Sequence, residues 1–284
     1  MCKFYGSLWK RPAAPPVLQG PLSFAKRLRK GLARWTPLGS RLVPEAPRRG
    51  LCGRKRLRSK GREDWKECLE QVLDGWGVHL PSRFYLQAEV YLREMLSYNR
   101  RVRLTSATDP RSVALRHFAD SLSPLPWLKK HFPAGASLVD VGAGAGFVGL
   151  CLKMAWPECR VTLLESSRRK HAFLDWMVSL LGLGDARALW GRAEEKKTLS
   201  PGAEYDVAVE RALAPLSVAL EWCSPWVKPE GCFLAFQGRR ASAPVGPDLA
   251  RSGFEWMEET VYQIPPIQFA GQLFIFRKRG RTCI

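Results

Sequence analysis

Histidine and paired cysteine are scarce in this sequence. Among its 284 residues there are four His and eight Cys, and no two cysteines form a C-x-x-C pair. Metal centres built from cysteine and histidine normally use such pairs at short spacing. The sequence therefore predicts no metal site, and the scattered cysteines are typical of thiols in a reducing compartment.

Long apolar runs are also missing. No stretch of about 18 apolar residues is present, as a membrane-spanning helix would require. No short apolar segment precedes a small-residue cleavage site of the secretory kind. We therefore expect neither export nor a membrane-spanning segment.

Acidic residues are nearly absent from the first 62 positions. Residues 1–62 contain 17 Lys and Arg but one acid, Glu45, which gives this segment +16 of the formal net charge of +19. Its Pro, Gly and Arg follow no sustained period, so we expect a disordered basic extension. Three interpretations of this extension stay open. It could be translated from a start upstream of the native one, which we favour, it could be an arm that binds nucleic acid, or it could be an organelle-targeting segment.

Residues 63–133 show the patterns of helices. Apolar residues recur at helical spacing over 63–76 and 82–101. Asp109-Pro110 provides the N-cap and first-turn proline that begin a helix, which we expect to run to about residue 122. These three helices predict an N-terminal helical subdomain.

Residues 134–284 alternate between strand and helix patterns. A helix capped by Ser166 is expected to run through Leu181 and to end at Gly182. The last two strands follow each other without a helix, which predicts an antiparallel hairpin. The pattern indicates an α/β fold around a mostly parallel sheet. Strands are expected at 137–141, 160–165, 186–190, 205–210, 232–237, 255–263 and 272–278.

The most informative stretch joins the first of these strands to a helix. The apolar run ends in Asp140, and Gly142, Gly144 and Gly146 alternate before Phe147 begins a helical pattern. Glycines let the backbone pass close beneath a ligand, and the N–H groups at a helix start can donate to it. The stretch therefore predicts a binding site for a nucleotide-type cofactor.

Two cofactors compete for this site. Residues 144–149 satisfy G-x-G-x-x-G, the fingerprint of NAD-binding folds, and Glu165 stands at the spacing of the ribose-binding acid. That spacing fits S-adenosylmethionine equally well. The carboxylate of Asp140, two positions before the first glycine, and the C-terminal hairpin favour S-adenosylmethionine. A glycine-rich turn that binds nothing is the third interpretation.

Five motifs give the chain a family resemblance. They lie at residues 98–110, 116–122, 140–147, 191–195 (Gly-Arg-Ala-Glu-Glu) and 211–216 (Arg-Ala-Leu-Ala-Pro-Leu). In their order and spacing the chain resembles RsmG, also called GidB, over about residues 65–280. This family comprises bacterial small-subunit (16S) ribosomal RNA guanine-N7 methyltransferases. The resemblance implies a Rossmann-like class I S-adenosylmethionine-dependent methyltransferase domain over 134–284, behind the helical subdomain, in the bacterial cytoplasm.

The resemblance also implies roles for individual residues. The methyl donor is S-adenosyl-L-methionine, and the partner is small-subunit rRNA or the 30S particle. Guanine N7 has an exposed lone pair, so the resemblance implies no catalytic residue beyond positioning by Arg211. Positions matching cofactor contacts are Gly142, Gly144, Phe147, Glu165, Ala193, Glu194 and Arg211, and positions matching RNA contacts are Asn99, Arg101, Arg116 and His117.

Without the family resemblance, purely structural roles for these residues stay open. Glu194 fits a solvated acidic turn, Arg211 a surface ion pair, His117 core packing, and any single arginine a solvated helix face. Five positions also depart from the family pattern: Arg103 replaces asparagine, Val148 proline, Glu210 a small residue, Gln237 lysine, and Gln272 falls where Arg-His is usual. Two other functions therefore stay open, a non-catalytic RNA-binding or assembly protein on a methyltransferase scaffold and a NAD-dependent oxidoreductase.

Overall fold

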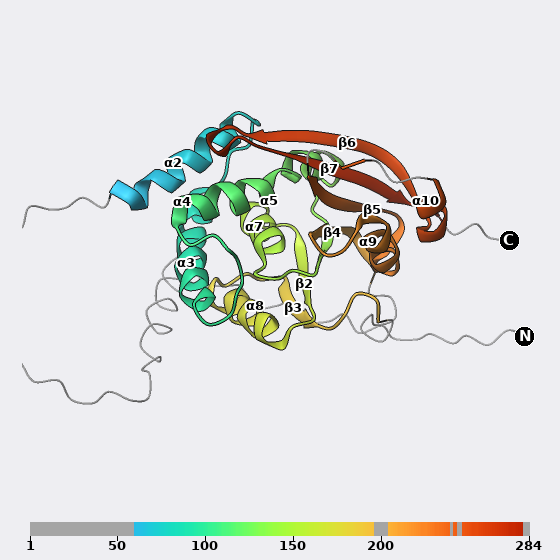
Figure 1. The fold of residues 1–284 in the computed structure, drawn as a ribbon, viewed down its shortest axis with the longest axis horizontal. Helices are drawn as coiled ribbons and strands as arrows, with labels where there is room; N and C mark the ends of the chain where they lie inside the picture. The colour runs from blue at the N-terminus through green and yellow to red at the C-terminus, as the bar shows by residue number, and fades with distance from the viewer. Residues whose placement is uncertain (1–59, 196–203, 239–240, 243–245, 281–284) are drawn as a thin grey trace, which may run out of the picture. The chain divides into compact units, whose positions relative to one another are not determined.

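Seven strands form one sheet in the computed structural model, which describes residues 60–195, 204–238, 241–242 and 246–280 (Figure 1). The strand order is β3-β2-β1-β4-β5-β7-β6. Strands β1 to β5 pair in parallel, and β7 lies antiparallel between β5 and β6. The strands are β1 (Ser137–Val141), β2 (Arg160–Glu165), β3 (Ala186–Trp190), β4 (Tyr205–Arg211), β5 (Val227–Gly238), β6 (Phe254–Ile264) and β7 (Phe269–Lys278).

This topology confirms the expected α/β fold of the Rossmann-like class I methyltransferase type. A dinucleotide-binding sheet has the order 3-2-1-4-5-6, whereas here an antiparallel strand is inserted between the fifth and sixth positions. The predicted C-terminal hairpin is therefore confirmed. All seven expected strands are present, although β5 begins five residues earlier than expected, at Val227.

Helices precede the sheet and connect most of its strands. The segment from 110 to 122 is continuous in helical form, but its middle is a π-helix. The helices are α2 (Lys60–Asp74), α3 (Ser82–Asn99), α4 (Pro110–Val113), the π-helix η1 (Ala114–Ala119), α5 (Asp120–Leu122), α6 (Leu125–His131), α7 (Phe147–Ala155), α8 (Arg168–Leu180), α9 (Leu216–Cys223) and α10 (Gly246–Ser252), with short 3-10 turns η3 (Ser224–Trp226) and η4 (Pro265–Ile267).

Two helix starts test the predicted caps. Asp109 is the N-cap of α4 and accepts a hydrogen bond from the Ser112 N–H at 2.9 Å, as predicted. The predicted cap at Ser166 is wrong, because the N-cap of α8 is Ser167 and its side chain makes no capping bond. The Ser166 carbonyl accepts from the Trp190 indole at 2.9 Å.

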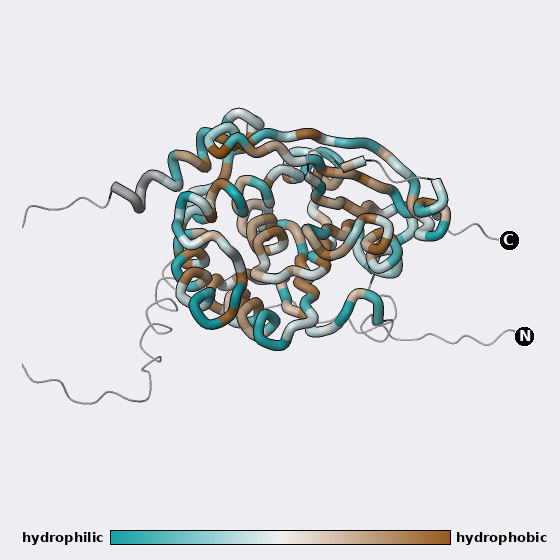
Figure 2. The backbone as a smooth tube through the Cα atoms, in the orientation of Figure 1, coloured by the Kyte–Doolittle hydropathy of each residue, from teal (hydrophilic) through white to brown (hydrophobic). Residues whose placement is uncertain are grey.

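The sheet separates two apolar cores. Along β1, Leu138 packs into one core, while Val139 and Val141 pack into the other, as alternation along a strand requires. The first core includes apolar residues of α3, α7 and α8, and the second includes those of α9. Figure 2 shows brown apolar segments gathered along the central strands and teal hydrophilic segments on many of the outer turns.

The expected domain division stays a prediction. Residues 60–62 belong to α2, and the remainder of the expected extension lies outside the described residues. The helices α2 to α6 all precede β1, so the chain order matches a helical subdomain over 63–133 followed by the sheet over 134–284.

Candidate functional site

The glycine loop, residues 142–146, joins β1 to α7 at the carboxyl end of the parallel strands. Gly142, Gly144 and Gly146 have φ values of 74°, 60° and 82°, in the left-handed region that other residues rarely adopt. The N–H groups of Gly142 and Ala143 both donate to the Leu164 carbonyl at 2.9 Å. The loop is therefore fixed against the end of β2.

Two buried carboxylates hold this loop from beneath. Asp140 accepts from the N–H of Gly149, in the first turn of α7, at 2.8 Å, and burial raises the pKa of Asp140 to about 6. Glu165, the last residue of β2, accepts from the Gly144 N–H at 2.8 Å and from the Ser167 N–H at 2.7 Å. A carboxylate has about four acceptor positions, so Glu165 keeps capacity for further donors.

One of the three glycine positions in the loop is open. A Cβ on Gly142 would lie 2.6 Å from the Leu213 side chain, and one on Gly146 would lie 2.6 Å from Leu174. At Gly144, in contrast, the nearest atom would be the Gly142 carbonyl oxygen at 3.8 Å, so this position is open. An open backbone beside the Glu165 carboxylate suits a ligand that presents hydroxyl donors.

Ala193 and Glu194 follow β3, the strand next to β2. Ala193 is buried, and its carbonyl accepts from the Trp226 indole at 3.1 Å. Glu194 is exposed and lies 3.5 Å from the Arg192 guanidinium. The structure thus places both residues at the same edge of the sheet as the glycine loop.

Phe147 begins α7 with its ring enclosed by protein. The ring stacks on His117 with a centroid distance of 4.0 Å and an interplanar angle of 10°. The Arg211 guanidinium lies 5.5 Å from the centroid of the same ring. Because Phe147 is 4% exposed, its ring offers no free face on which a cofactor could stack.

Arg211, the last residue of β4, is joined to the helical segment. Its guanidinium donates to Asp120 at 2.9 Å and to the Ser121 hydroxyl at 3.2 Å. The other Asp120 oxygen accepts from the Tyr262 hydroxyl of β6. Asp120 and Tyr262 were missed by sequence reasoning; Asp120 stands in the motif 116–122, while nothing in the sequence distinguishes Tyr262.

The four predicted RNA contacts divide into two pairs. Asn99 accepts from the N–H groups of Leu104 and Thr105, at 2.7 and 3.0 Å, and donates to the Thr105 carbonyl. His117 lies 2.7 Å from the Thr105 hydroxyl, and burial, with Arg211 and Arg116 nearby, lowers the pKa of His117 to about 3. These two side chains therefore join the turn 99–105 to Phe147.

Arg101 and Arg116, the other pair, are exposed. Arg116 belongs to the π-helix η1, which also contains His117. Short π-helical segments are frequent at functional sites. The exposed guanidinium of Arg116 and the His117 ring that stacks on Phe147 therefore lie on the same turn.

Two of the five departures from the family pattern, Glu210 and Gln237, contact each other. Glu210 is 1% exposed, accepts from the Leu213 N–H at 3.1 Å, and lies 3.4 Å from the Gln237 amide nitrogen. Burial raises the pKa of Glu210 to about 7, although the Leu213 N–H opposes the shift. Gln272 donates to Glu259 at 2.7 Å. The ion pair of Arg211 is formed with Asp120, whose side chain is 7% exposed, so it is not a surface ion pair.

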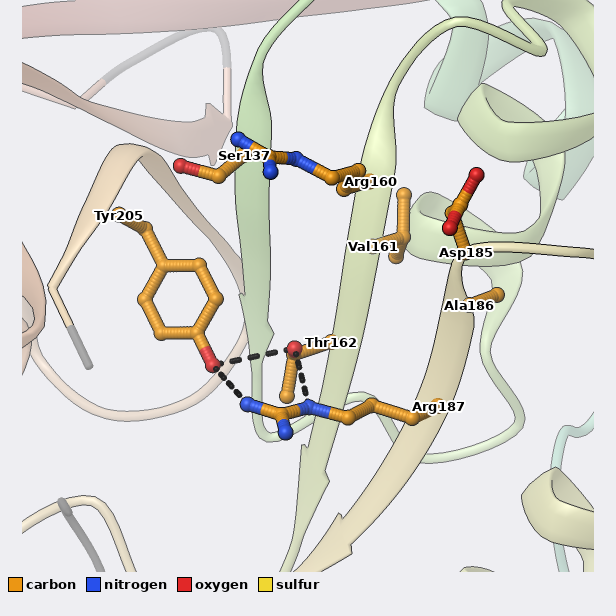
Figure 3. A pocket seen from close by; sticks show the side chains of 8 residues that line it. All are labelled: Ser137, Arg160, Val161, Thr162, Asp185, Ala186, Arg187 and Tyr205. Carbon is orange, nitrogen blue, oxygen red and sulfur yellow. Dashed lines mark hydrogen bonds between the residues drawn. The ribbon is translucent and has the colours of Figure 1, made fainter. Parts of the chain in front are cut away.

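A separate cavity of about 290 Å³ lies at the opposite edge of the sheet (Figure 3). Within it, the Tyr205 hydroxyl donates to Thr162 at 3.0 Å, and Arg187 donates to both. Ligands of open α/β sheets bind beyond the carboxyl ends of the strands, so this cavity is distinct from the candidate site. It is lined by Ser137, Arg160, Val161, Thr162, Asp185, Ala186, Arg187 and Tyr205.

The described residues contain neither a metal-binding cluster nor a membrane-spanning helix. No cluster of three or more His, Cys, Asp or Glu in the described ranges is arranged to hold a metal ion. No helix formed by the described residues has the length and apolar character needed to cross a membrane.

Comparisons with known proteins place this site in context. A family model, GidB, described as rRNA small subunit methyltransferase G, matches residues 85–254. Ribosomal RNA small subunit methyltransferase G of Pelotomaculum thermopropionicum is 40% identical over 222 residues, which cover 76% of this chain and 91% of that protein. The protein of the same name from Roseiflexus is 38% identical over 198 residues, covering 69% and 82%.

Solved structures give more distant similarities. A putative sarcosine dimethylglycine methyltransferase from Galdieria sulphuraria has a TM-score of 0.45 at 13% identity, covering 60% of this chain and 88% of that chain. M. jannaschii TYW2, solved in complex with AdoMet, has a TM-score of 0.41 at 13% identity, covering 52% and 70%.

Proposed function

This chain belongs to the GidB family of small-subunit rRNA methyltransferases, and from that membership we propose that it transfers a methyl group from S-adenosylmethionine to N7 of a guanine in small-subunit (16S) rRNA. The observation that carries the proposal is the glycine loop at the end of β1, held at Gly144 by the Glu165 carboxylate and next to β4, the paired strand that ends in Arg211. The family assignment leaves the NAD-dependent oxidoreductase without support.

The residues of the glycine loop and of the β2 and β3 ends would hold the cofactor. Glu165 would accept hydroxyl donors of the ribose, Gly144 offers an open backbone, and Ala193 and Glu194 border the adenine. Backbone N–H groups at the start of α7 would donate to its polar atoms. When bound, S-adenosylmethionine would supply a methyl group on a positively charged sulfur: the new bond to guanine N7 would form as the methyl–sulfur bond breaks, and neutral S-adenosylhomocysteine would leave.

The chain's own contribution to the reaction is positioning. Arg211 is fixed by Asp120 and lies at the carboxyl end of β4, where its donors can orient the base or a phosphate. No general base is required, because N7 carries no proton. His117 is uncharged at neutral pH and serves by its stack on Phe147.

The substrate proposed is small-subunit rRNA or the 30S particle, and the proposed location is the bacterial cytoplasm. In A-form RNA the N7 edge of guanine faces a deep and narrow groove. The target guanine is therefore expected in a loop or splayed out of its stack. Arg101 and Arg116 are the proposed phosphate contacts.

The test is methylation of 30S particles and of naked 16S rRNA with labelled S-adenosylmethionine, followed by mass mapping of the modified nucleotide. The expected product is a single 7-methylguanosine. Binding of rRNA and cofactor without transfer to either substrate would favour the non-catalytic assembly protein instead, and methylation at another atom would overturn the N7 assignment.

Glu165 provides a separate prediction for the cofactor. Glu165→Gln keeps an acceptor for the Gly144 N–H but loses the charge, so we expect S-adenosylmethionine to bind more weakly by roughly 1.5–3 kcal/mol. Calorimetry measures this affinity, with Glu67→Gln, at an exposed residue of α2, as the control. Unchanged affinity in Glu165→Gln would remove Glu165 from the cofactor site.

A further inference from the structure

An exposed tryptophan lies one strand away from the proposed ribose-binding acid. Trp190 is the last residue of β3 and is paired in register with Glu165 on β2. Its side chain is 50% exposed, although large aromatic side chains normally gain most from burial. The Trp190 indole donates to the Ser166 carbonyl at 2.9 Å, so the ring is fixed in an exposed position.

A guanidinium lies over this ring. The Arg168 Cζ is 4.6 Å from the Trp190 centroid, which is a cation–π arrangement. Arg168 and Arg169 begin α8, and both are exposed. Neither forms an ion pair within the part of the chain that the structure describes.

Charge at this helix start opposes the helix dipole. The first turn of α8 contains Arg168, Arg169 and Lys170 and no acid. Cations at a helix N-terminus are unfavourable, because the dipole already places partial positive charge there. The arrangement costs stability and leaves a positive surface, which suits a polyanionic partner.

The end of α3 extends the same surface. The Tyr98 hydroxyl donates to the Arg169 carbonyl at 3.2 Å, which joins the end of α3 to the first turn of α8. Arg100 and Arg103 follow Tyr98 in the turn closed by Asn99, and both are exposed. We call this the α3–α8 surface, and it consists of Tyr98, Arg100, Arg103, Arg168, Arg169 and Trp190.

We propose that the α3–α8 surface binds single-stranded rRNA flanking the target guanine, with a base stacked at Trp190 and phosphates neutralised by the arginines. The inference rests on the proposed function for its choice of RNA. Exposed aromatic rings interleaved with unpaired arginines are the combination by which proteins bind single strands. A duplex is not expected here, because its bases are already stacked on one another.

The charge test compares two double variants of the full chain. Arg168→Gln with Arg169→Gln removes two proposed phosphate contacts, whereas Lys129→Gln with Lys130→Gln removes two exposed charges from α6, outside the surface. Binding of 16S rRNA fragments is measured against salt concentration. Each lost single-strand contact lowers the slope of log K against log salt by about 0.7, so we expect a fall of about 1.4 for the α8 variant and little change for the α6 variant.

The stacking test compares Trp190→Phe with Trp190→Ala. Both variants lose the indole bond to Ser166, but phenylalanine keeps a ring for stacking. If Trp190 is only structural, both variants should therefore lose activity to the same extent. We expect Trp190→Ala to raise KM for rRNA about fivefold or more, the loss of one stacked base. Trp190→Phe is expected to stay within about twofold, and kcat and S-adenosylmethionine affinity are expected to be unchanged in both.

These readouts separate this inference from the proposed function. If the wild-type chain methylates rRNA but the α8 variant keeps the wild-type salt slope and KM, the α3–α8 surface is not an RNA site. If the wild-type chain binds rRNA with the expected slope but transfers no methyl group, the proposed function fails while the surface stands. Equal competition by polyglutamate and by RNA of the same charge would also overturn the RNA assignment.

Discussion

The guanidinium of Arg211 lies between a buried carboxylate and an aromatic ring. Asp120, 7% exposed in its side chain, accepts from it at 2.9 Å, and the Phe147 ring lies on its other side at 5.5 Å. Removing one partner of a buried ion pair leaves the other charge uncompensated. Loss of activity on mutation of Arg211 alone therefore does not separate a structural role from a positioning role.

A double variant separates them. We expect Arg211→Ala to lose about 3–5 kcal/mol of stability, because Asp120 stays charged and buried, and also to lose rRNA methylation. Adding Asp120→Asn removes that charge and should restore much of the thermal stability. Methylation is expected to stay low in the double variant, measured with labelled S-adenosylmethionine. Recovery of both properties together would assign Arg211 to structure alone.

Glu210 gives the chain a pH-dependent stability. Burial raises its folded-state pKa to about 7, from the ordinary value of 4.5. The folded state therefore binds its proton more tightly than the unfolded state does, so the stabilising contribution is complete below about pH 4.5 and is lost as the pH rises through about 7.

Glu210→Gln tests this dependence. The glutamine can still accept from the Leu213 N–H and remains neutral at all pH values. We expect a Tm several degrees above that of the wild type at pH 8 and little difference at pH 4.5. Calorimetry at both pH values checks this, with the exposed Glu221→Gln as control. A variant that is less stable at pH 8 would show that the carboxylate is charged and stabilising.

Among the helices and strands, the features that depend on residues close together in the sequence were predicted correctly. Apolar patterns and turn residues predict the hairpin of β6 and β7 and the strand β1 before the glycine loop. N-cap chemistry predicts the Asp109 cap. The π-helix η1 did not follow, because its sequence has ordinary helical spacing and the extra residue per turn depends on what packs around it. The Ser166 cap was wrong by one residue, because two consecutive serines precede α8 and the local sequence does not distinguish which of them is the N-cap.

The Asp109 cap sets the start of the segment that carries Arg116, His117 and Asp120. Asp109→Ala leaves the Ser112 N–H without its acceptor, so we expect a loss of about 1 kcal/mol in the free energy of unfolding. Asp109→Asn is the matched control, since asparagine caps about as well. Urea unfolding of both variants measures the difference. Equal stability of the alanine and asparagine variants would show that tertiary packing, not the cap, fixes this helix start.

At the scale of the molecule, the candidate site joins parts that lie far apart in sequence. Arg211 of β4, Asp120 of α5 and Tyr262 of β6 form one network over 142 residues of separation. The glycine loop and Glu165 could be predicted, because both end adjacent parallel strands. The Asp120–Tyr262 contact could not be predicted, because no local pattern specifies which side chain of the C-terminal hairpin faces the helix α5, which contains Asp120.

Charge is divided unequally over the whole chain, and that division gives the last prediction. Residues 1–62 carry +16, while residues 63–284 carry +3. Trp65 of α2 is 2% exposed and packs in the first core, so a truncation after residue 62 keeps this core residue. We expect residues 63–284 to fold with nearly the full Tm and to retain kcat.

RNA affinity is the property expected to change in this truncation. The basic extension adds non-specific attraction to phosphates, which salt screens. The truncated chain should therefore bind 16S rRNA more weakly at low salt and converge with the full chain as salt increases, while the arginines of the α3–α8 surface still act. A difference that persists at high salt would mean that residues 1–62 make specific contacts, and failure to fold would mean that they contribute to the core.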